Sequence, residues 1–480
     1  MKSVWTNLSA AQRDRAAGVL VGTAAGDALG AGYEFGGPLP ADAPVDMIGG
    51  GLGPFAPGEW TDDTAMAVAI AEVAAAEVDL RHDRAQDQIV ERWHWWARSA
   101  KDVGVQTRSV LSATGRDGIS ADTARKEAAA LHQRTGRTAG NGSLMRTAPV
   151  ALAYLDDEAG LVEAARALSE LTHFDPEAGD ACVLWCAAIR HAVLTGEFDV
   201  RIGLGHIDSA RRDLWASRIE DAEAKAPADF ARKNGWVVAA LQGAWSAVVR
   251  TPVPREDPGA GVFRADHLRL GLEAAVRGGG DTDTVAAIAG GLLGGAHGLS
   301  AVPARWRLML KGWPGLNTRG LVHLATQIVG GGPNVSSYGS HLAVVHPHDG
   351  DVWIGAEGAL RQLPARVDAV VSLCRVADGD IPADVEQLDV RLIDKVGHNP
   401  HLDFVLLDTV QAIERFRADG RRVFLHCAHA QSRTPTVAAL YGARRQGLDI
   451  DRALAEVCAA LPAADPNPDF RAALRRLHPR

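Results

Sequence analysis

The spacing of hydrophobic positions changes once along the chain, near residue 330. Before that point, Ala-rich segments repeat their apolar positions every three to four residues, as an α-helix with one buried face does. Runs of β-branched residues are nearly absent there, so we predict an all-α domain over residues 1–330. Helices are expected at 64–76, 161–171, 179–194, 236–249 and 284–293.

The last part of the chain alternates short apolar runs with helical patterns. Strands are expected at 341–346, 352–354, 367–373, 388–393 and 423–425, and helices at 402–415 and 434–442. Strands that alternate with helices predict an α/β domain with a largely parallel sheet, over residues 341–480. Residues 331–340 are rich in Gly and Ser, which is typical of a flexible linker. The sequence therefore predicts a multidomain chain.

Composition narrows the possible partners. Apolar residues make up 47% and charged residues 23% of the 480 residues, and the net charge is −9. This is a packed globular composition without the Lys and Arg excess of nucleic-acid or membrane-surface proteins, so we expect neither partner. Five cysteines without paired spacing indicate reduced thiols. No apolar stretch precedes Arg13, so no secretory signal is expected and we predict a cytoplasmic enzyme.

Two helix starts carry an unusual number of acidic and hydroxyl side chains. Thr61, Asp62 and Asp63 open one apolar helix, and Asp281, Asp283 and Thr284 open another. Helix capping alone explains one oxygen at each start, but each motif offers several. Carboxylates buried together repel one another unless cations neutralise them. Oxygen ligands without His or Cys favour Mg²⁺ or Mn²⁺, so we predict a two-metal site where the starts face each other.

Further polar residues accompany these motifs. Asp27 and Glu34 lie in a Gly-rich segment before residues 35–60, a Gly- and Pro-rich loop that we interpret as a lid. Asp102 lies between helical segments. The glycine-rich turn that contains Gly142 and Ser143 could present backbone N–H groups to a phosphate, although a plain turn explains it equally well. His173 alone is more often structural than functional.

Together these motifs resemble the ADP-ribosylglycohydrolase family of the dinitrogenase-reductase-activating type. The matching segments span roughly residues 14–315, in the order GTAAGDALGAGYEF, EWTDDTAMAVAI, KDVGVQTRSVL, GNGSLMRTAPVALAY, LTHFDPEAGDAC and GGDTDTVAAIAGGLLGG. The resemblance implies an all-α fold with two Mg²⁺ or Mn²⁺ ions. The implied reaction hydrolyses the glycosidic bond between ribose C1″ and a protein side chain, often arginine, while bound metals fix the sugar hydroxyls.

The same resemblance implies roles for individual residues. Asp102 matches an acid that assists the chemistry, and Glu34 matches a lid-side acid near the metals. Val105 and Gln106 replace residues common in the family, which bears on the leaving-group contacts. The ADP-ribose contacts fall on Gly142, Ser143 and His173. The implied metal ligands are Thr61, Asp62, Asp63, Asp281, Asp283 and Thr284.

A second motif lies in the α/β part. Cys427 and Arg433 are separated by five residues between a predicted strand and a helix. Such a loop can wrap backbone N–H groups around a phosphate, and the helix N-terminus favours a thiolate at Cys427. Arg433 can bind two phosphate oxygens, and Ser432 could stabilise the departing thiolate. A buried Cys with an unrelated Arg is the alternative, which the strand–loop–helix context disfavours.

Residues 341–475 resemble the dual-specificity type of Cys-based protein phosphatases. The resemblance implies attack by Cys427 on phosphorus, a phosphocysteine intermediate and no metal. Asp394 matches the acid that protonates the leaving oxygen, with Asp403 as the alternative. The family usually has Gly where this chain has Ala430. If that position requires positive φ, Ala costs on the order of 1 kcal/mol.

The leading hypothesis is a bifunctional hydrolase. Its expected partners are ADP-ribosylated and phosphorylated proteins, or small ADP-ribosyl and phosphate compounds. Two alternatives remain open: an ADP-ribose-binding module that tethers an active phosphatase, and an active glycohydrolase with a degenerate phosphatase domain.

Overall fold

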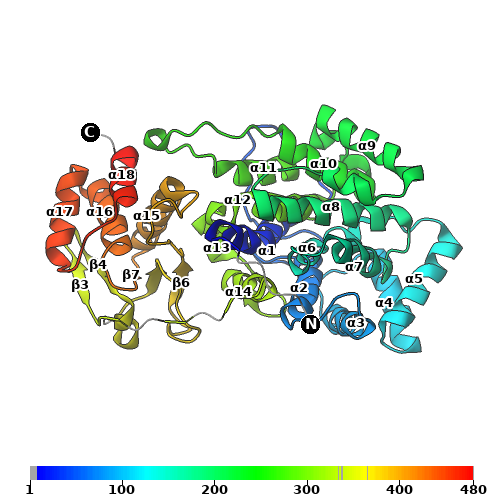
Figure 1. The fold of residues 1–480 in the computed structure, drawn as a ribbon, viewed down its shortest axis with the longest axis horizontal. Coiled ribbons are helices and arrows are strands. Elements are labelled where there is room, and N and C mark those ends of the chain that lie inside the picture. The colour runs from blue at the N-terminus through cyan, green and yellow to red at the C-terminus, as the bar shows by residue number, and fades with distance from the viewer. Residues whose placement is uncertain (1–7, 333–334, 337–338, 365, 479–480) are drawn as a thin grey trace. The chain divides into compact units, whose positions relative to one another are not determined.

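A computed structural model describes residues 8–332, 335–336, 339–364 and 366–478 of the chain. They form two compact units (Figure 1). The first unit comprises Met1–Pro252, His267–Val302 and Met309–Gly331, and the second comprises Val253–Asp266, Pro303–Leu308 and Gly332–Arg480. The two short segments, 253–266 and 303–308, group with the second unit although they precede residue 331.

The first unit is built around two glycine-rich helices, α1 (Ala10–Gly30) and α12 (Thr282–His297). A Cβ atom on Gly22 would lie 2.3 Å from the carbonyl oxygen of Gly290, and one on Gly294 would lie 1.9 Å from that of Gly18. Both distances are shorter than real Cβ contacts, so only glycine permits these backbones to touch. The glycines of α1 recur every four residues and form one face of the helix. This close packing brings the end of α1 beside the start of α12.

Helices surround this central pair. They include α2 (Asp62–Ala75), α3 (Asp83–Ala97), α4 (Val105–Asp117), α5 (Ala121–Thr135), α6 (Ala148–Ala153), α7 (Glu158–Glu170), α8 (Pro176–Thr195), α9 (Ser209–Ala224), α10 (Val237–Arg250), α11 (Asp266–Arg277) and α14 (Thr318–Ile328). The five helices expected from the sequence are confirmed, with ends shifted by a few residues. One small departure from the all-α prediction is an antiparallel pair of two-residue strands, β1 (Lys311–Gly312) and β2 (Leu316–Asn317).

The second unit contains a five-stranded sheet in the order β3-β4-β7-β5-β6. The strands are β3 (Ala343–His346), β4 (Asp349–Ala356), β5 (Ala369–Ser372), β6 (Glu386–Asp389) and β7 (Val423–Cys427). Strands β4, β7, β5 and β6 run parallel, and β3 pairs antiparallel with β4. The helices are α13 (Ala304–Met309), which falls almost wholly in this unit, α15 (Leu402–Ala418), α16 (Arg433–Gln446), α17 (Ile450–Ala460) and α18 (Pro468–Leu477).

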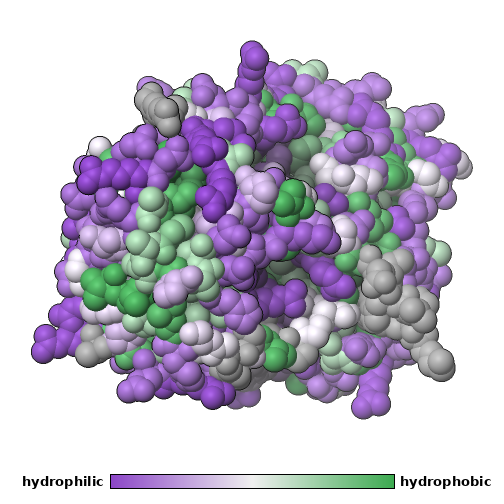
Figure 2. Space-filling model, turned by 60° about the vertical axis from the view of Figure 1, so that its left-hand side comes forward, coloured by the Kyte–Doolittle hydropathy of each residue, from purple (hydrophilic) through white to green (hydrophobic). Residues whose placement is uncertain are grey.

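The α/β prediction therefore holds for this unit, and strand β7 lies at the centre of the sheet, buried along its length. Its carboxyl end, at Cys427, meets the start of α16, which is where parallel sheets commonly place their sites. Hydrophilic residues cover most of the face in Figure 2, with smaller hydrophobic areas between them. Within the described residues, no helix combines the length and apolar character needed to cross a bilayer.

Candidate active sites

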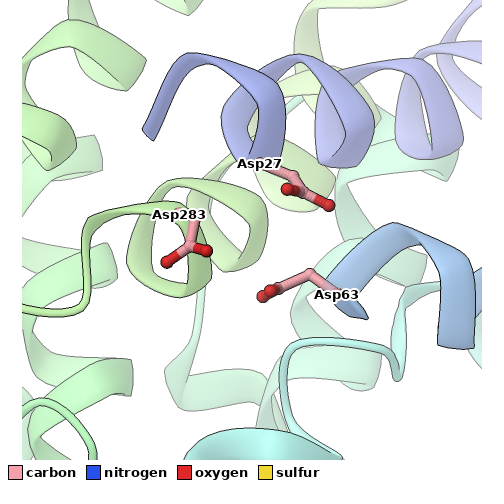
Figure 3. A group of neighbouring side chains, drawn as sticks. All are labelled: Asp27, Asp63 and Asp283. Atoms are coloured by element: carbon pink, nitrogen blue, oxygen red, sulfur yellow. The ribbon is translucent and has the colours of Figure 1, made fainter. Parts of the chain in front are cut away.

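Three carboxylates from separate helices converge in the first unit. Asp27 comes from the end of α1, Asp63 from the start of α2 and Asp283 from the start of α12, and the three point toward one another (Figure 3). One oxygen atom from each lies within 4.8 Å of the others. All three side chains are buried. The two acidic helix starts of the sequence therefore face each other in space.

Asp27 holds the start of α2 in place. Its Oδ1 accepts the N–H of Thr61 at 2.8 Å, and its Oδ2 accepts the N–H of Thr64 at 2.9 Å. The side chain thus caps α2 from a different helix, where backbone N–H groups would otherwise lack acceptors. The sequence alone indicates no role for Asp27, because the cap spans more than 30 residues and depends on the packing of α1.

A second oxygen cluster shares Asp283. Glu34, Asp281 and Asp283 offer oxygens within 4.8 Å of one another. The Thr61 hydroxyl donates to Asp63 Oδ2 at 3.2 Å, and it lies 3.4 Å from Asp283 Oδ2. Thr284, which follows Asp283, donates its backbone N–H to Asp283 Oδ1 at 2.9 Å. Two overlapping groups of oxygen ligands therefore lie side by side, as two nearby cations would require.

The electrostatics of this cluster are unfavourable without positive charge. Burial raises the pKa of Asp62 to about 8, helped by the nearby Asp102 carboxylate. Burial likewise raises the pKa of Glu34 to about 7, and that of Asp63 and Asp283 well above the ordinary range. The pKa values of Asp27 and Asp281 are raised for the same reason. Buried carboxylates that repel one another are stabilised when a cation holds them in their charged form.

The donor atoms fit divalent cations. Every acidic or hydroxyl group of the cluster offers oxygen, the ligand that Mg²⁺ and Mn²⁺ prefer. Asp63 Oδ1 is buried and has no hydrogen-bond partner among the described residues. A buried carboxylate oxygen without a donor is costly unless an ion satisfies it. These acidic groups could therefore hold metal.

The remaining predicted residues of this site lie around the cluster. Asp102 is near enough to raise the pKa of Asp62, and the N–H of Gly104, two residues on, donates to Asp62 Oδ2 at 3.3 Å. A Cβ on Gly142 would lie 3.0 Å from His173 Cε1, so the glycine turn rests on that imidazole. Burial holds the pKa of His173 well below its usual value, which keeps the ring neutral. Buried Ser143 accepts a hydrogen bond from the Ser169 hydroxyl at 2.9 Å.

Asn141 connects the glycine turn to the carboxylates. Its Nδ2 donates to Asp281 Oδ2 at 2.7 Å and to the carbonyl of Asn234 at 2.9 Å. Asn234 in turn accepts the N–H of Asp281 at 3.0 Å. Neither asparagine was singled out from the sequence, because their partner lies far away along the chain. The turn and the acidic cluster consequently form one continuous site.

Residues 35–60 contain turns and isolated bridges instead of regular elements. The loop is nevertheless tied to the site: Glu34 accepts the N–H of Leu52 at 3.2 Å, and Gly36 pairs with Gly280. Lys101 lies 2.7 Å from both carboxylate oxygens of Glu59, next to Asp102 in the sequence. These contacts place the loop beside the acidic cluster, and its role as a lid stays a prediction.

The second site lies at the end of β7. Cys427 is buried there, and α16 begins at Arg433 after the five-residue loop. Within the loop, Ala430 has φ 53°, the left-handed region that favours glycine. Position 430 therefore has the positive φ for which glycine is preferred, and this chain adopts that strained conformation with an alanine.

The guanidinium of Arg433 is anchored from one side. Its Nη1 donates to the carbonyls of Leu373 at 3.1 Å and Leu392 at 3.0 Å. Its Nε is buried without a hydrogen-bond partner in the described part of the chain, and lies 3.9 Å from Asp394 Oδ2. A guanidinium fixed at one nitrogen, with another left unsatisfied, is prepared to bind an oxyanion such as phosphate.

The two candidate acids differ in their surroundings. Asp394 Oδ1 accepts a hydrogen bond from Asn467 at 3.0 Å, and its other oxygen faces Arg433. Asp403 instead forms two hydrogen bonds of 2.7 Å with Arg476. That fork pairs α15 with α18, so the geometry favours Asp394 over Asp403.

A buried histidine supports the cysteine strand. Burial lowers the pKa of His426 to about 3, so the imidazole is neutral. Its Nε2 lies 2.8 Å from the hydroxyl of Ser372 on the neighbouring strand. The ring also stacks on Phe424, with centroids 5.3 Å apart. These contacts fix the end of β7 where the loop begins.

Comparison with known proteins places the chain in a family. A family model described as ADP-ribosylglycohydrolase matches residues 8–334, which is more than half of the chain. The chain belongs to the ADP-ribosylglycohydrolase family. ADP-ribosylarginine hydrolase Tri1 of Pseudomonas putida (strain GB-1) is 30% identical over 300 residues, covering 61% of this chain and 73% of that protein. ADP-ribosyl-[dinitrogen reductase] glycohydrolase of Rhodospirillum rubrum is 30% identical over 299 residues, covering 61% and 89%.

A shorter likeness concerns phosphatases. Protein phosphatase Slingshot homolog 3 of Mus musculus is 30% identical over 133 residues, covering 27% of this chain and 20% of that protein.

Among solved structures, an ADP-ribosylglycohydrolase-related protein complex has a TM-score of 0.48 at 28% identity, covering 66% of this chain and 98% of that one. Human DUSP28 has a TM-score of 0.26 at 24% identity, covering 30% and 97%.

Proposed function

We propose that the chain is a bifunctional hydrolase. Its first unit removes ADP-ribose from ADP-ribosyl-arginine in proteins in a metal-dependent reaction, and its second unit hydrolyses phosphate monoesters through a cysteine. The observation that carries the first activity is the convergence of buried, mutually repelling carboxylates from α1, α2 and α12. Family membership supports hydrolysis of an ADP-ribosyl bond, and the name of the Tri1 relative supports arginine as its acceptor.

Each residue of the first site has a defined task in this proposal. Two Mg²⁺ or Mn²⁺ ions, when bound, would fix the ribose hydroxyls and polarise the attacking water. Glu34 offers an oxygen beside Asp281 and Asp283, and Asp102 lies near Asp62, so these two carboxylates are placed to move a proton at the ribose. In the overall reaction the C1″–N bond breaks, water supplies the hydroxyl at C1″, and a proton goes to the arginine nitrogen. The metal ligands would be Thr61, Asp62, Asp63, Asp281, Asp283 and Thr284. Of these, Asp63, Asp281 and Asp283 offer oxygens to the two groups described above, whereas both oxygens of Asp27 already accept N–H groups from the start of α2.

The substrate contacts follow from the arrangement around the cluster. The backbone N–H groups of Gly142 and Ser143 would bind the diphosphate, and the neutral His173 ring would pack against the turn. The hydrogen bond from Asn141 to Asp281 fixes the position of the turn relative to the acidic cluster. The diphosphate at the turn and the ribose at the cluster would therefore be bound at a fixed separation. Fixing both ends of ADP-ribose places the anomeric carbon for attack.

The first test measures ADP-ribose release from an ADP-ribosyl-arginine protein, with Mg²⁺ or Mn²⁺ and with EDTA. We expect metal-dependent release that is lost in Asp62→Ala. Glu72→Ala is the matched control, because Glu72 lies on the same helix and pairs with Arg92 at 3.0 Å, away from the cluster. No release, with tight ADP-ribose binding intact, would contradict hydrolysis and favour the tethering module.

The phosphatase activity is carried by a separate observation. Arg433, which begins the helix after the Cys427 loop, is anchored to two backbone carbonyls. Its Nε stays buried and unsatisfied among the described residues, 3.9 Å from Asp394 Oδ2. Cys427 Sγ would attack phosphorus as the phosphorus–oxygen bond breaks, and Asp394 would give its proton to the leaving oxygen. Water would then cleave the phosphocysteine, with Asp394 accepting a proton, and Ser432 would stabilise the released thiolate.

The second test uses an aryl phosphate and needs no added metal. We expect turnover in EDTA that iodoacetamide abolishes and that Arg433→Met removes. Cys458→Ser is the control for thiol chemistry, because Cys458 lies on α17 and is the more exposed thiol. Alkylation of wild type and Cys458→Ser should inactivate both alike. Turnover that survives alkylation would contradict a cysteine mechanism.

A further inference from the structure

Asn467 joins three parts of the cysteine site that lie far apart in the sequence. Its backbone N–H donates to Ser432 Oγ at 3.1 Å, in the loop after Cys427. Its Nδ2 donates to Asp394 Oδ1 at 3.0 Å, after β6. Its Oδ1 accepts the N–H of Phe470 at 3.1 Å and so caps α18. One residue therefore contacts the loop, the candidate acid and a helix start.

The side chain of Asn467 has only one orientation that satisfies all its partners. The Phe470 N–H requires an acceptor, and the Asp394 carboxylate requires a donor, so the amide cannot be reversed. Phe470 is fully buried, which anchors the cap in the core of the unit. Two residues earlier, the N–H of Asp465 donates to the carbonyl of Gln431 at 2.7 Å. Residues 465–467 thus fasten to the loop at two points.

The hydrogen bond to Asp394 also distinguishes its two oxygens. Oδ1 is occupied by the Asn467 amide, whereas Oδ2 faces Arg433 Nε at 3.9 Å. A carboxyl group whose Oδ1 accepts from an amide carries its transferable proton on Oδ2. That oxygen lies on the side where Arg433 would bind phosphate, which is where a leaving oxygen needs a proton.

We propose that Asn467 is a positioning residue for the acid of the second site, a role that rests on the proposed phosphatase function. It holds Asp394 beside Arg433 and Ser432, with the proton on Oδ2. As the Cys427 sulfur–phosphorus bond forms and the phosphorus–oxygen bond breaks, that proton passes to the leaving oxygen. Asn467 itself touches neither sulfur nor phosphate.

The test replaces Asn467 with Ser in the full chain. Serine is a good N-cap and keeps the backbone N–H to Ser432, but it cannot reach Asp394 with an amide donor. We measure kcat/KM for phenyl phosphate, whose leaving group needs a proton, and for 2,4-dinitrophenyl phosphate, whose leaving group does not. For phenyl phosphate we expect a loss on the order of tenfold, which is part of the roughly 10²–10⁴-fold that a general acid supplies. For 2,4-dinitrophenyl phosphate we expect almost no loss.

Two controls separate positioning from stability. Asn317→Ser makes the same exchange at the N-cap of α14, where the side chain accepts from Gly320 at 3.2 Å, and should leave both rates unchanged. In an Asp394→Asn background, Asn467→Ser should cost nothing more, because the proton is already lost. If Asn467→Ala unfolds while the Ser variant does not, the cap explains that difference.

The outcomes are distinguishable. An equal loss for both substrates, or a full additional loss in the Asp394→Asn background, would overturn the positioning role and leave the phosphatase intact. Absence of turnover by the wild type with either substrate would overturn the proposed phosphatase function, and the positioning role with it.

Discussion

The two sites reach opposite solutions to the problem of burying polar groups. In the first unit, Asp63 and Asp283 come together with carboxylates as neighbours, and burial raises their pKa well above the usual range. In the second unit, Arg433 and Asp394 each have hydrogen-bond partners from the protein itself. The first arrangement becomes favourable when cations are added, whereas in the second the buried Arg433 Nε, unsatisfied among the described residues, is complemented by an oxyanion. The difference between the sites therefore concerns what each must bind before it can act.

The largest expected effect is a crossed loss of activity. Cys427→Ser should lower phosphate release by about 10³-fold or more and leave ADP-ribose release unchanged, because it removes only the nucleophile. Asp63→Asn should lower ADP-ribose release by about 10²-fold or more and spare phosphate release. Both rates are measured on each variant with the same two substrates. Loss of both activities in either variant would contradict two independent sites.

The next effect is stabilisation by metal, confined to the first unit. A cation at 100 times its Kd should raise the free energy of unfolding by about 2.7 kcal/mol. Hydrogen exchange should slow at the starts of α2 and α12, and stay unchanged in β7 and α16. Asp63→Asn removes a carboxyl group whose ionisation is disfavoured by burial, so it should be more stable than wild type in EDTA near neutral pH and gain less from metal. Protection spread equally over both units would contradict a metal site in the first.

The two units should also respond to pH in opposite directions. Carboxyls with raised pKa, such as Glu34 at about 7 and Asp62 at about 8, keep protons in the folded state that the unfolded chain loses above about pH 4. Without metal, the first unit should therefore lose stability as pH rises from about 4 to 8. His426, with a pKa of about 3, and His346, at about 4, are neutral when folded but charge when unfolded below about 6.5.

The second unit should consequently lose stability as pH falls, by about 2 kcal/mol per buried histidine between pH 7 and pH 5. Hydrogen exchange in EDTA, corrected for intrinsic rates, reports each unit separately at both pH values. His426→Gln should reduce the acid loss in the second unit and leave the first unit unchanged. A common direction in both units would contradict the assignment of these charges.

The sequence predicted the parts of each site that are local to one helix start or one loop. The acidic pairs after residues 60 and 280 and the Cys427–Arg433 spacing are short-range patterns, and the fold brings Asp63 and Asp283 of the two acidic pairs together. The all-α and α/β character followed from periodicity, which each unit's elements confirm. These features depend on residues close in the chain, so they can be predicted from the spacing of residues in the sequence alone.

What the sequence could not provide are the supports that cross the fold. The cap of α2 by Asp27 requires the close glycine packing of α1 on α12. Asn141 reaches Asp281 across 140 residues, and Asn467 reaches Asp394 across 73. Segments 253–266 and 303–308 group with the second unit only through tertiary contacts. Such long-range contacts produce no recognisable periodicity or motif spacing in the sequence. Each partner taken alone is an ordinary polar residue, so the contact cannot be predicted from it.

The sequence raised the question of Ala430, but only the structure shows its backbone angle. Its substitution is expected to give the smallest effect among these predictions, and it is the sharpest test of the degenerate-phosphatase alternative. Its φ of 53° costs an alanine on the order of 1 kcal/mol that glycine would not pay. Ala430→Gly should therefore be more stable than Ala428→Gly, the same exchange in the same loop without positive φ, by about 1 kcal/mol in chemical denaturation. Because the loop already adopts this φ with alanine, kcat/KM for an aryl phosphate should change little in Ala430→Gly. A large gain in turnover with glycine would instead mean that the alanine narrows the loop, and would favour the degenerate alternative for the second unit.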